Sequence, residues 1–155
     1  MKKRFLALIC AILFSVTSVF AGNISVEAAE PQGEDVPFSY LLTEDAIIGY
    51  AESMTRGVYL LDGYSVINNA GSGKIGCGGV TDAAKRCTVM VNAIVERQTS
   101  TGWARVTSWT KTNTNALTAS ISKTLSVTSG YYYRVRSIHG AGSDSSSSWT
   151  SGLWM

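Results

Sequence analysis

The sequence predicts an all-β protein, an antiparallel β-sandwich of about seven or eight strands that follows an export signal and an acidic arm. Two observations predict this fold. From Arg56 onward, alternating or β-branched segments are separated by turn residues about every 10 to 13 positions, and helical periodicity is lacking. The 134 residues that follow the predicted signal are enough for one domain with its own core. A closed barrel is the alternative arrangement of the same strands.

Residues 1–21 have the pattern of a signal peptide. Lys2, Lys3 and Arg4 precede an uncharged, mainly apolar stretch from Phe5 to Phe20. This stretch is shorter than the roughly 20 apolar residues that span a bilayer. We therefore expect cleavage after Ala21, or alternatively after Ala28, and a secreted product without a transmembrane anchor.

Residues 22–55 form an acidic arm. They contain seven Asp or Glu residues and no Lys or Arg, whereas residues 56–155 contain ten basic residues and four acids, so the arm carries −7 and the body +6. Gly22–Pro37 has few large apolar residues and is expected to be flexible. Phe38–Met54 allows one short helix, with Thr43 as its cap. The charge division suggests that the arm screens part of the basic body and imitates an acidic partner.

Residues 56–155 are predicted to form the sandwich. Turn sequences separate its strands: Asp62-Gly63, Asn68–Gly73, Ser100–Gly102, Thr112–Asn115, Ser129-Gly130 and Gly140–Ser147. The predicted strands are Val58–Leu61, Tyr64–Ile67, Lys74–Thr81, Cys87–Arg97, Trp103–Lys111, Leu117–Leu125, Tyr131–His139 and Trp149–Trp154. Cys87–Arg97 has the clearest alternation and is expected to lie centrally.

Cys77 and Cys87 are the two cysteines that remain after removal of the signal. In an exported protein they can form one disulfide, which would close a small loop. A pair of free thiols is the alternative.

Catalytic chemistry is poorly supported. The body has one histidine, His139, and four scattered acids, and no Gly-x-Ser-x-Gly sequence is present. His139 is expected at an exposed strand end. Asp62 with Glu96 is a carboxylate pair without further support as a glycosidase. One histidine and two separated cysteines do not match a zinc site. The sequence thus predicts no enzyme, metal or cofactor, and no nucleic-acid partner.

Aromatic and basic residues are the stronger signal for binding. Large rings are concentrated after residue 102, and Arg134 and Arg136 flank Val135 on one strand face. Such rings supply contact area, and arginines attract anionic polymers. The candidate ligand-binding residues are Trp103, Trp109, Tyr132, Arg134, Arg136, His139 and Trp149. The competing interpretation is that the rings fill the core and the arginines form a solvated face.

Two resemblances appear in this region. The alternation from Leu125 to Val135, led by a tyrosine, resembles the tyrosine corner of fibronectin type III and immunoglobulin-like sandwiches, with Val127 where proline is common. The segments Thr55–Leu60, Gly102-Trp103, Ser122–Arg136 with His139, and Ser148–Trp154 resemble an uncharacterised family, a domain of unknown function found in small secreted Gram-positive proteins. That resemblance implies export and a β fold, and it transfers no site residues.

Together these observations predict a monomeric, non-enzymatic extracellular module that binds glycans or surface proteins. A secreted bacteriocin-like antagonist and a small secreted hydrolase are the alternatives.

Overall fold

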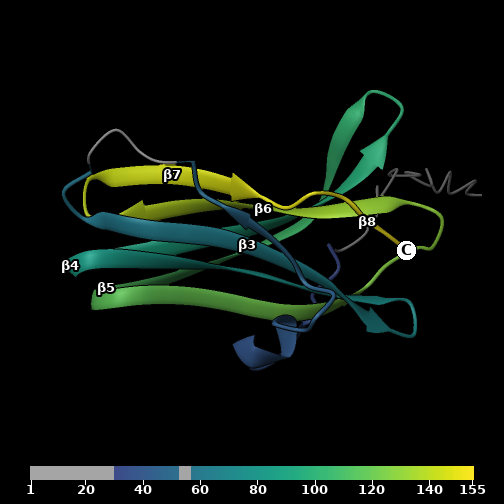
Figure 1. Ribbon diagram of the computed structural model, residues 1–155, viewed down its shortest axis with the longest axis horizontal. Helices are drawn as coiled ribbons and strands as arrows, with labels where there is room; N and C mark the ends of the chain where they lie inside the picture. The colour runs from purple at the N-terminus through teal and green to yellow at the C-terminus, as the bar shows by residue number, and fades with distance from the viewer. Residues whose placement is uncertain (1–29, 53–56) are drawn as a thin grey trace, which may run out of the picture.

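The computed structural model describes residues 30–52 and 57–155, which form antiparallel strands in one eight-stranded sheet folded into two layers (Figure 1). The predicted signal peptide, the start of the arm and the predicted boundary between residues 55 and 56 lie outside the described residues. The elements are β1 (Glu34–Asp35), the 3-10 helix η1 (Phe38–Leu41), β2 (Ile47–Tyr50), β3 (Leu60–Gly71), β4 (Lys74–Thr99), β5 (Gly102–Ser126), β6 (Tyr132–Ala141), β7 (Asp144–Trp149) and β8 (Leu153–Trp154). The predicted all-β sandwich is therefore confirmed.

Two long strands, β4 and β5, pass from one layer to the other. Their pairing is interrupted between Asp82 and Cys87 of β4, and on the two sides of this break β4 has different further neighbours. Residues 74–83 pair with β3, and residues 89–97 pair with β6. Layer one thus contains β1, β2, β3 and the halves of β4 and β5 nearest the β3–β4 turn. Layer two contains the other halves with β6, β7 and β8.

The core lies between the layers and is built from alternate residues. On β4, Val89, Val91, Ala93 and Val95 are buried, as the alternation predicts. Ile67 of β3 and Val135 of β6 belong to the same cluster. Tyr133 is also buried, and its hydroxyl donates to the carbonyl oxygen of Thr128 at 2.9 Å. This return bond to the backbone is of the tyrosine-corner type that the resemblance to fibronectin type III domains implies, and Tyr133 forms it.

Glycines in β4 allow other chain segments to approach closely. A Cβ at Gly78 would collide with the carbonyl oxygen of Ile121 and would lie 2.7 Å from Cδ1 of Leu41. Leu41 of η1 is therefore completely buried against the outer face of layer one. The short blue coil of η1 lies below β5 in Figure 1. The side-chain amide of Asn68 holds η1 there by donating to the carbonyl oxygens of Tyr40 and Leu41 at 3.1 and 3.3 Å.

Several local predictions were wrong. The helix considered within Phe38–Met54 is not found in residues 38–52, which contain the single 3-10 turn η1 and then β2, which pairs with β3. Within Gly22–Pro37, which the sequence predicts to be flexible, Glu34 and Asp35 form β1 and pair with β5. Asp62-Gly63 and Thr112–Asn115 lie inside strands β3 and β5 rather than between separate strands, at register shifts in their pairing.

The cysteines are separated along one strand. Cys77 pairs across from Lys123 in layer one, and Cys87 pairs across from Ala116 at the layer crossing. Both thiols are free, so the disulfide considered from the sequence is not formed. Burial raises the pKa of the Cys77 thiol to about 12.

Candidate functional site

Alternation along β6 directs two arginines to the outer face of layer two. Tyr133 and Val135 point into the core, so Tyr132, Arg134 and Arg136 between and beside them point outward. Arg134 lies opposite Glu96 of β4, and Arg136 lies opposite Trp149 of β7. The prediction that the two arginines share one strand face is therefore correct.

Cross-strand register adds tryptophans from three other strands to this face. The Arg134 guanidinium lies 4.4 Å from the ring centre of Trp103 on β5. The rings of Tyr132 and Trp154 are 4.9 Å apart, with Trp154 on β8. We call this surface the aromatic-arginine face; its residues are Trp103, Tyr132, Arg134, Arg136, Trp149 and Trp154.

The two arginines are held by one buried carboxylate. Glu96 is 6% exposed and accepts hydrogen bonds from Nε of Arg134 at 2.7 Å and Nε of Arg136 at 3.1 Å. Two cations against one anion leave a net charge of +1 in this triad. Among the described residues, the terminal guanidinium nitrogens of Arg134 and Arg136 form no further side-chain hydrogen bond or ion pair. The triad thus fixes two donor groups beside the rings without neutralising both.

The face combines accessible rings with fixed donors. Tyr132, Trp149 and Trp154 are 42%, 45% and 57% exposed. Rings of this kind stack on flat apolar surfaces, including the C–H faces of sugars, while guanidinium groups bind carboxylates and phosphates. The arrangement can bind an extended ligand that carries both chemistries.

Five of the seven residues predicted for binding meet on this face: Trp103, Tyr132, Arg134, Arg136 and Trp149. Both arginines lie on this outer face, partly exposed, and both pair with Glu96. Sequence reasoning missed Trp154 and Glu96 as members of the site. The alternation could have indicated Trp154, but the Glu96 contacts require the strand register.

His139 was expected at an exposed strand end, and this prediction was wrong. Its side chain lies on the inner face of β6 and is 0% exposed. Nδ1 of His139 lies 2.8 Å from Oγ1 of Thr81, and Nε2 lies 2.8 Å from Oγ of Ser148. His139 is therefore an interior residue and is removed from the candidate site.

A chain of buried hydroxyl groups extends from His139 across the space between the layers. Oγ of Ser148 lies 2.7 Å from Oγ of Ser65, which donates to Oγ of Ser137 at 2.8 Å. All three serines are 0% exposed. Burial lowers the pKa of His139 to about 4, against a smaller opposing effect of Asp62. The pair Ser148–His139 has the contact of a nucleophile and its base, but substrate cannot reach it in this state.

Trp109 also lies away from the aromatic-arginine face. Its partner across the strands is Ala93, a core residue, so its ring points toward the interior side of β5. There it packs against Gly33 of the arm. A Cβ added to Gly33 would lie 2.9 Å from Cζ2 of Trp109. Trp109 therefore belongs to a different surface, described below.

Among residues 30–52 and 57–155, no three His, Cys, Asp or Glu side chains gather as metal ligands. A search of the same residues for a helix long and apolar enough to cross a membrane found none.

Comparisons with known proteins give one family assignment. No curated protein sequence matches the chain. The "Solution Structure of R. palustris CsgH" shares 15% sequence identity, covers 66% of this chain and 87% of its own, and has a TM-score of 0.34. A TM-score this low does not establish a common fold. The family of unknown function DUF6147 matches residues 23–152, which confirms the resemblance to an uncharacterised family. The chain belongs to the DUF6147 family.

Proposed function

We propose that this protein is a non-enzymatic extracellular binding module whose aromatic-arginine face holds acidic glycans. The observation that carries the proposal is the gathering of Trp103, Tyr132, Trp149 and Trp154 around Arg134 and Arg136 on one face of layer two. Core packing does not account for Tyr132, Trp149 and Trp154, because all three are 42% or more exposed.

Acidic glycans fit the face because they present two kinds of group along one extended chain. The C–H face of a sugar ring stacks on indole or phenol, and a carboxylate or phosphate on the same unit reaches a guanidinium. Glu96 favours this match by fixing the orientation of both arginines before a ligand arrives, which lowers the entropy lost on binding.

A non-enzymatic role is supported by the position of the chain's single histidine. His139 and its partner Ser148 are 0% exposed. Glu96, the carboxylate beside the two arginines, is already paired with both of them. An extracellular location is supported by the sequence pattern of residues 1–21, which is typical of an export signal.

The test is a binding measurement with the chain from residue 22, against polygalacturonate, a teichoic acid and a neutral β-glucan, each at two salt concentrations. We expect Trp149→Ala to weaken binding to the acidic polymers about tenfold, equivalent to about 1.4 kcal/mol. Arg136→Gln should weaken it as well and should reduce its dependence on salt.

Two matched variants serve as controls. Tyr50→Ala removes an exposed ring, 64% exposed, from β2 in layer one. Lys85→Gln removes a cation that lies 4.2 Å from the ring centre of Tyr59, away from the face. Both should bind as the parent protein does. Equal binding by all four variants, or no binding to any of the three polymers, would contradict the proposal.

A further inference from the structure

The second candidate surface is the edge of β5 that the acidic arm covers. Residues 30–36, which we call the strap, run along this edge across both layers. The strap begins beside Arg105 and Thr107 in layer two and ends beside Ser122 in layer one. It therefore bridges the open side of the sandwich.

Each acid of the strap meets a cation of the body. Glu30 pairs with Arg105 at 2.9 Å, Glu34 with Lys74 at 3.7 Å, and Asp35 with Lys123 at 2.9 Å. The expectation that the acidic arm screens part of the basic body is correct for these three cations. The edge of β5 is therefore lined by positive charges that pair with acidic side chains of the strap.

The strap also uses backbone groups, as an added strand does. Glu34 and Asp35 pair with Thr124 and Lys123 in antiparallel register. The amide of Val36 donates to the carbonyl oxygen of Ser122 at 3.2 Å, and the Ser122 hydroxyl donates to the carbonyl oxygen of Val36. Oγ1 of Thr107 donates to the carbonyl oxygen of Pro31 at 3.0 Å. An extended peptide is therefore the shape that this edge accepts.

The strap is held lightly. None of its residues is buried, and the side chains of Glu34 and Asp35 are 78% and 88% exposed. Ion pairs as exposed as these contribute little to stability. The strap has regular strand pairing at two residues only. Another peptide with the same features can compete for the edge.

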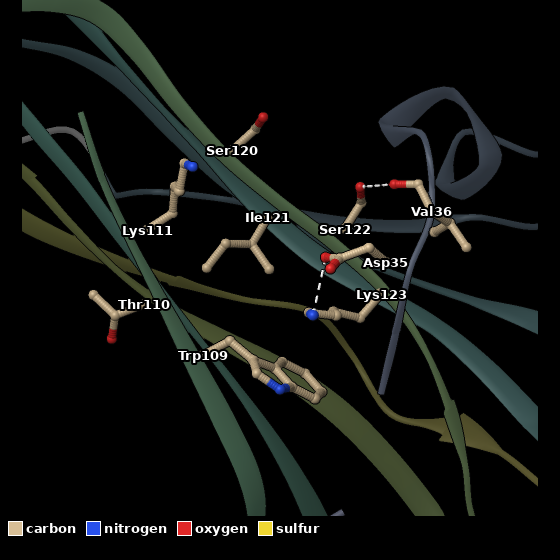
Figure 2. Close-up of a pocket in the computed structure, with 9 residues that line it drawn as sticks. All are labelled: Asp35, Val36, Trp109, Thr110, Lys111, Ser120, Ile121, Ser122 and Lys123. Atoms are coloured by element: carbon tan, nitrogen blue, oxygen red, sulfur yellow. Dashed lines mark hydrogen bonds and ion pairs between the residues drawn. The ribbon is translucent and has the colours of Figure 1, made fainter. Parts of the chain in front are cut away.

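Open space adjoins the strap on both sides. A pocket of about 360 Å³ lies between Asp35 and the stretches 109–111 and 120–123 of β5 (Figure 2). A second pocket, of about 410 Å³, is lined by Pro31–Glu34, Lys74 and residues 124–126. Figure 2 shows Nζ of Lys123 between the Asp35 carboxylate and the Trp109 ring. Asp35 is the one acid among the residues that line the first pocket, beside Lys111 and Lys123.

We propose that the β5 edge beneath the strap is a binding site for an extended acidic peptide of another protein, and that the strap is its intramolecular competitor. The incoming peptide replaces the strap's backbone pairing with Ser122–Thr124 and places its carboxylates on Arg105, Lys123 and Lys74. This site adjoins the aromatic-arginine face, because Arg105 lies opposite Glu96, but the proposal does not rest on the function proposed above.

The test uses the chain from residue 22 with a neutral strap, made by Glu30→Gln, Glu34→Gln and Asp35→Asn together. A capped peptide with the sequence of residues 30–36 is titrated into this variant and into the parent protein, and amide shifts are followed by ¹⁵N NMR. We expect apparent binding about tenfold tighter in the neutral-strap variant, because the linked competitor is weakened. The shifts should map to Thr107, Lys123 and Thr124.

Two controls separate site binding from general charge attraction. The same peptide with Gln and Asn in place of its acids should not bind. Lys123→Gln in the neutral-strap background should weaken binding, whereas Lys85→Gln, which removes the same charge elsewhere, should not.

Three results would overturn the proposal. One is a neutral-strap variant with a native spectrum that does not bind the acidic peptide. Another is a set of shifts confined to the aromatic-arginine face. The third is tighter binding of oligogalacturonate than of the peptide at the β5 edge, which would assign the edge to glycans. Should the triple variant lose its native spectrum, Asp35→Asn alone is titrated and judged by the same outcomes.

Discussion

At the scale of single residues, His139 is the clearest case of a side chain whose chemistry is set by burial. It is the only histidine in the chain and contacts Thr81 and Ser148 rather than a carboxylate. The folded state therefore favours neutral imidazole, and the pKa of His139 falls to about 4 from its usual value of 6.5. Between these two pH values the unfolded chain binds more protons than the folded one.

Stability should consequently fall as the pH is lowered through this window. We expect a loss of about 2 kcal/mol in the free energy of unfolding between about pH 7 and about pH 5, measured by urea titration. His139→Gln should largely remove this pH dependence over the same range. A parent protein that is equally stable at both pH values would show that His139 is not held neutral by the fold.

A glycine gives a second prediction at this scale. Gly78→Ala should lower the free energy of unfolding by about 1 to 3 kcal/mol, because its Cβ would collide with the Ile121 carbonyl oxygen and crowd Leu41. Gly140→Ala is the matched control, since its Cβ would meet only Met90, at 3.3 Å or more. Thermal unfolding of the two variants decides the matter, and equal effects would contradict this explanation of Gly78.

At the scale of elements, the turn residues explain which predictions failed. Ser100–Gly102 was predicted as a turn, and the described β4–β5 hairpin turns there. Asp62-Gly63 is also a turn-type sequence but lies in β3 at a register shift, where a Cβ on Gly63 would be 2.6 Å from Cγ of His139. Turn-forming residues thus serve inside these long strands as bulges and as space for a neighbour. The distant partner that requires the space cannot be identified from local sequence.

Asp144, at the start of β7, forms hydrogen bonds to the backbone at the start of β3. Its carboxylate accepts from the backbone amides of Tyr59 and Leu60 at 2.5 and 3.1 Å, and these bonds lower the pKa of Asp144. Asp144→Ala should accelerate hydrogen exchange at both amides, while exchange at core amides such as Val91 changes less. Unchanged exchange at Tyr59 and Leu60 would show that the carboxylate does not protect them.

At the scale of the whole molecule, the sequence predicted the sandwich better than the site. Alternation in Val89–Val95 identifies a central strand because one face of it is buried everywhere along its length. The aromatic-arginine face depends instead on β4, β5, β6, β7 and β8 lying side by side, and no local pattern states that order. This is why Arg134 and Arg136 were predicted correctly as neighbours, while Glu96 was not recognised as their partner.

The two cysteines report on the stability of the whole fold. Cys77 is 1% exposed in the core cluster with a raised thiol pKa, whereas Cys87 is only partly buried at the layer crossing. Since thiolate is the reactive form, a thiol reagent should label Cys87 in the native chain from residue 22 and reach Cys77 only after unfolding. In a Cys87→Ser variant, Cys77 should be labelled at least about 10³-fold more slowly than in urea, and its rate should follow the free energy of unfolding. Fast labelling of Cys77 in the native protein would contradict its burial in the core. A mass lower by two hydrogens, which indicates a disulfide between Cys77 and Cys87, would contradict two separate free thiols.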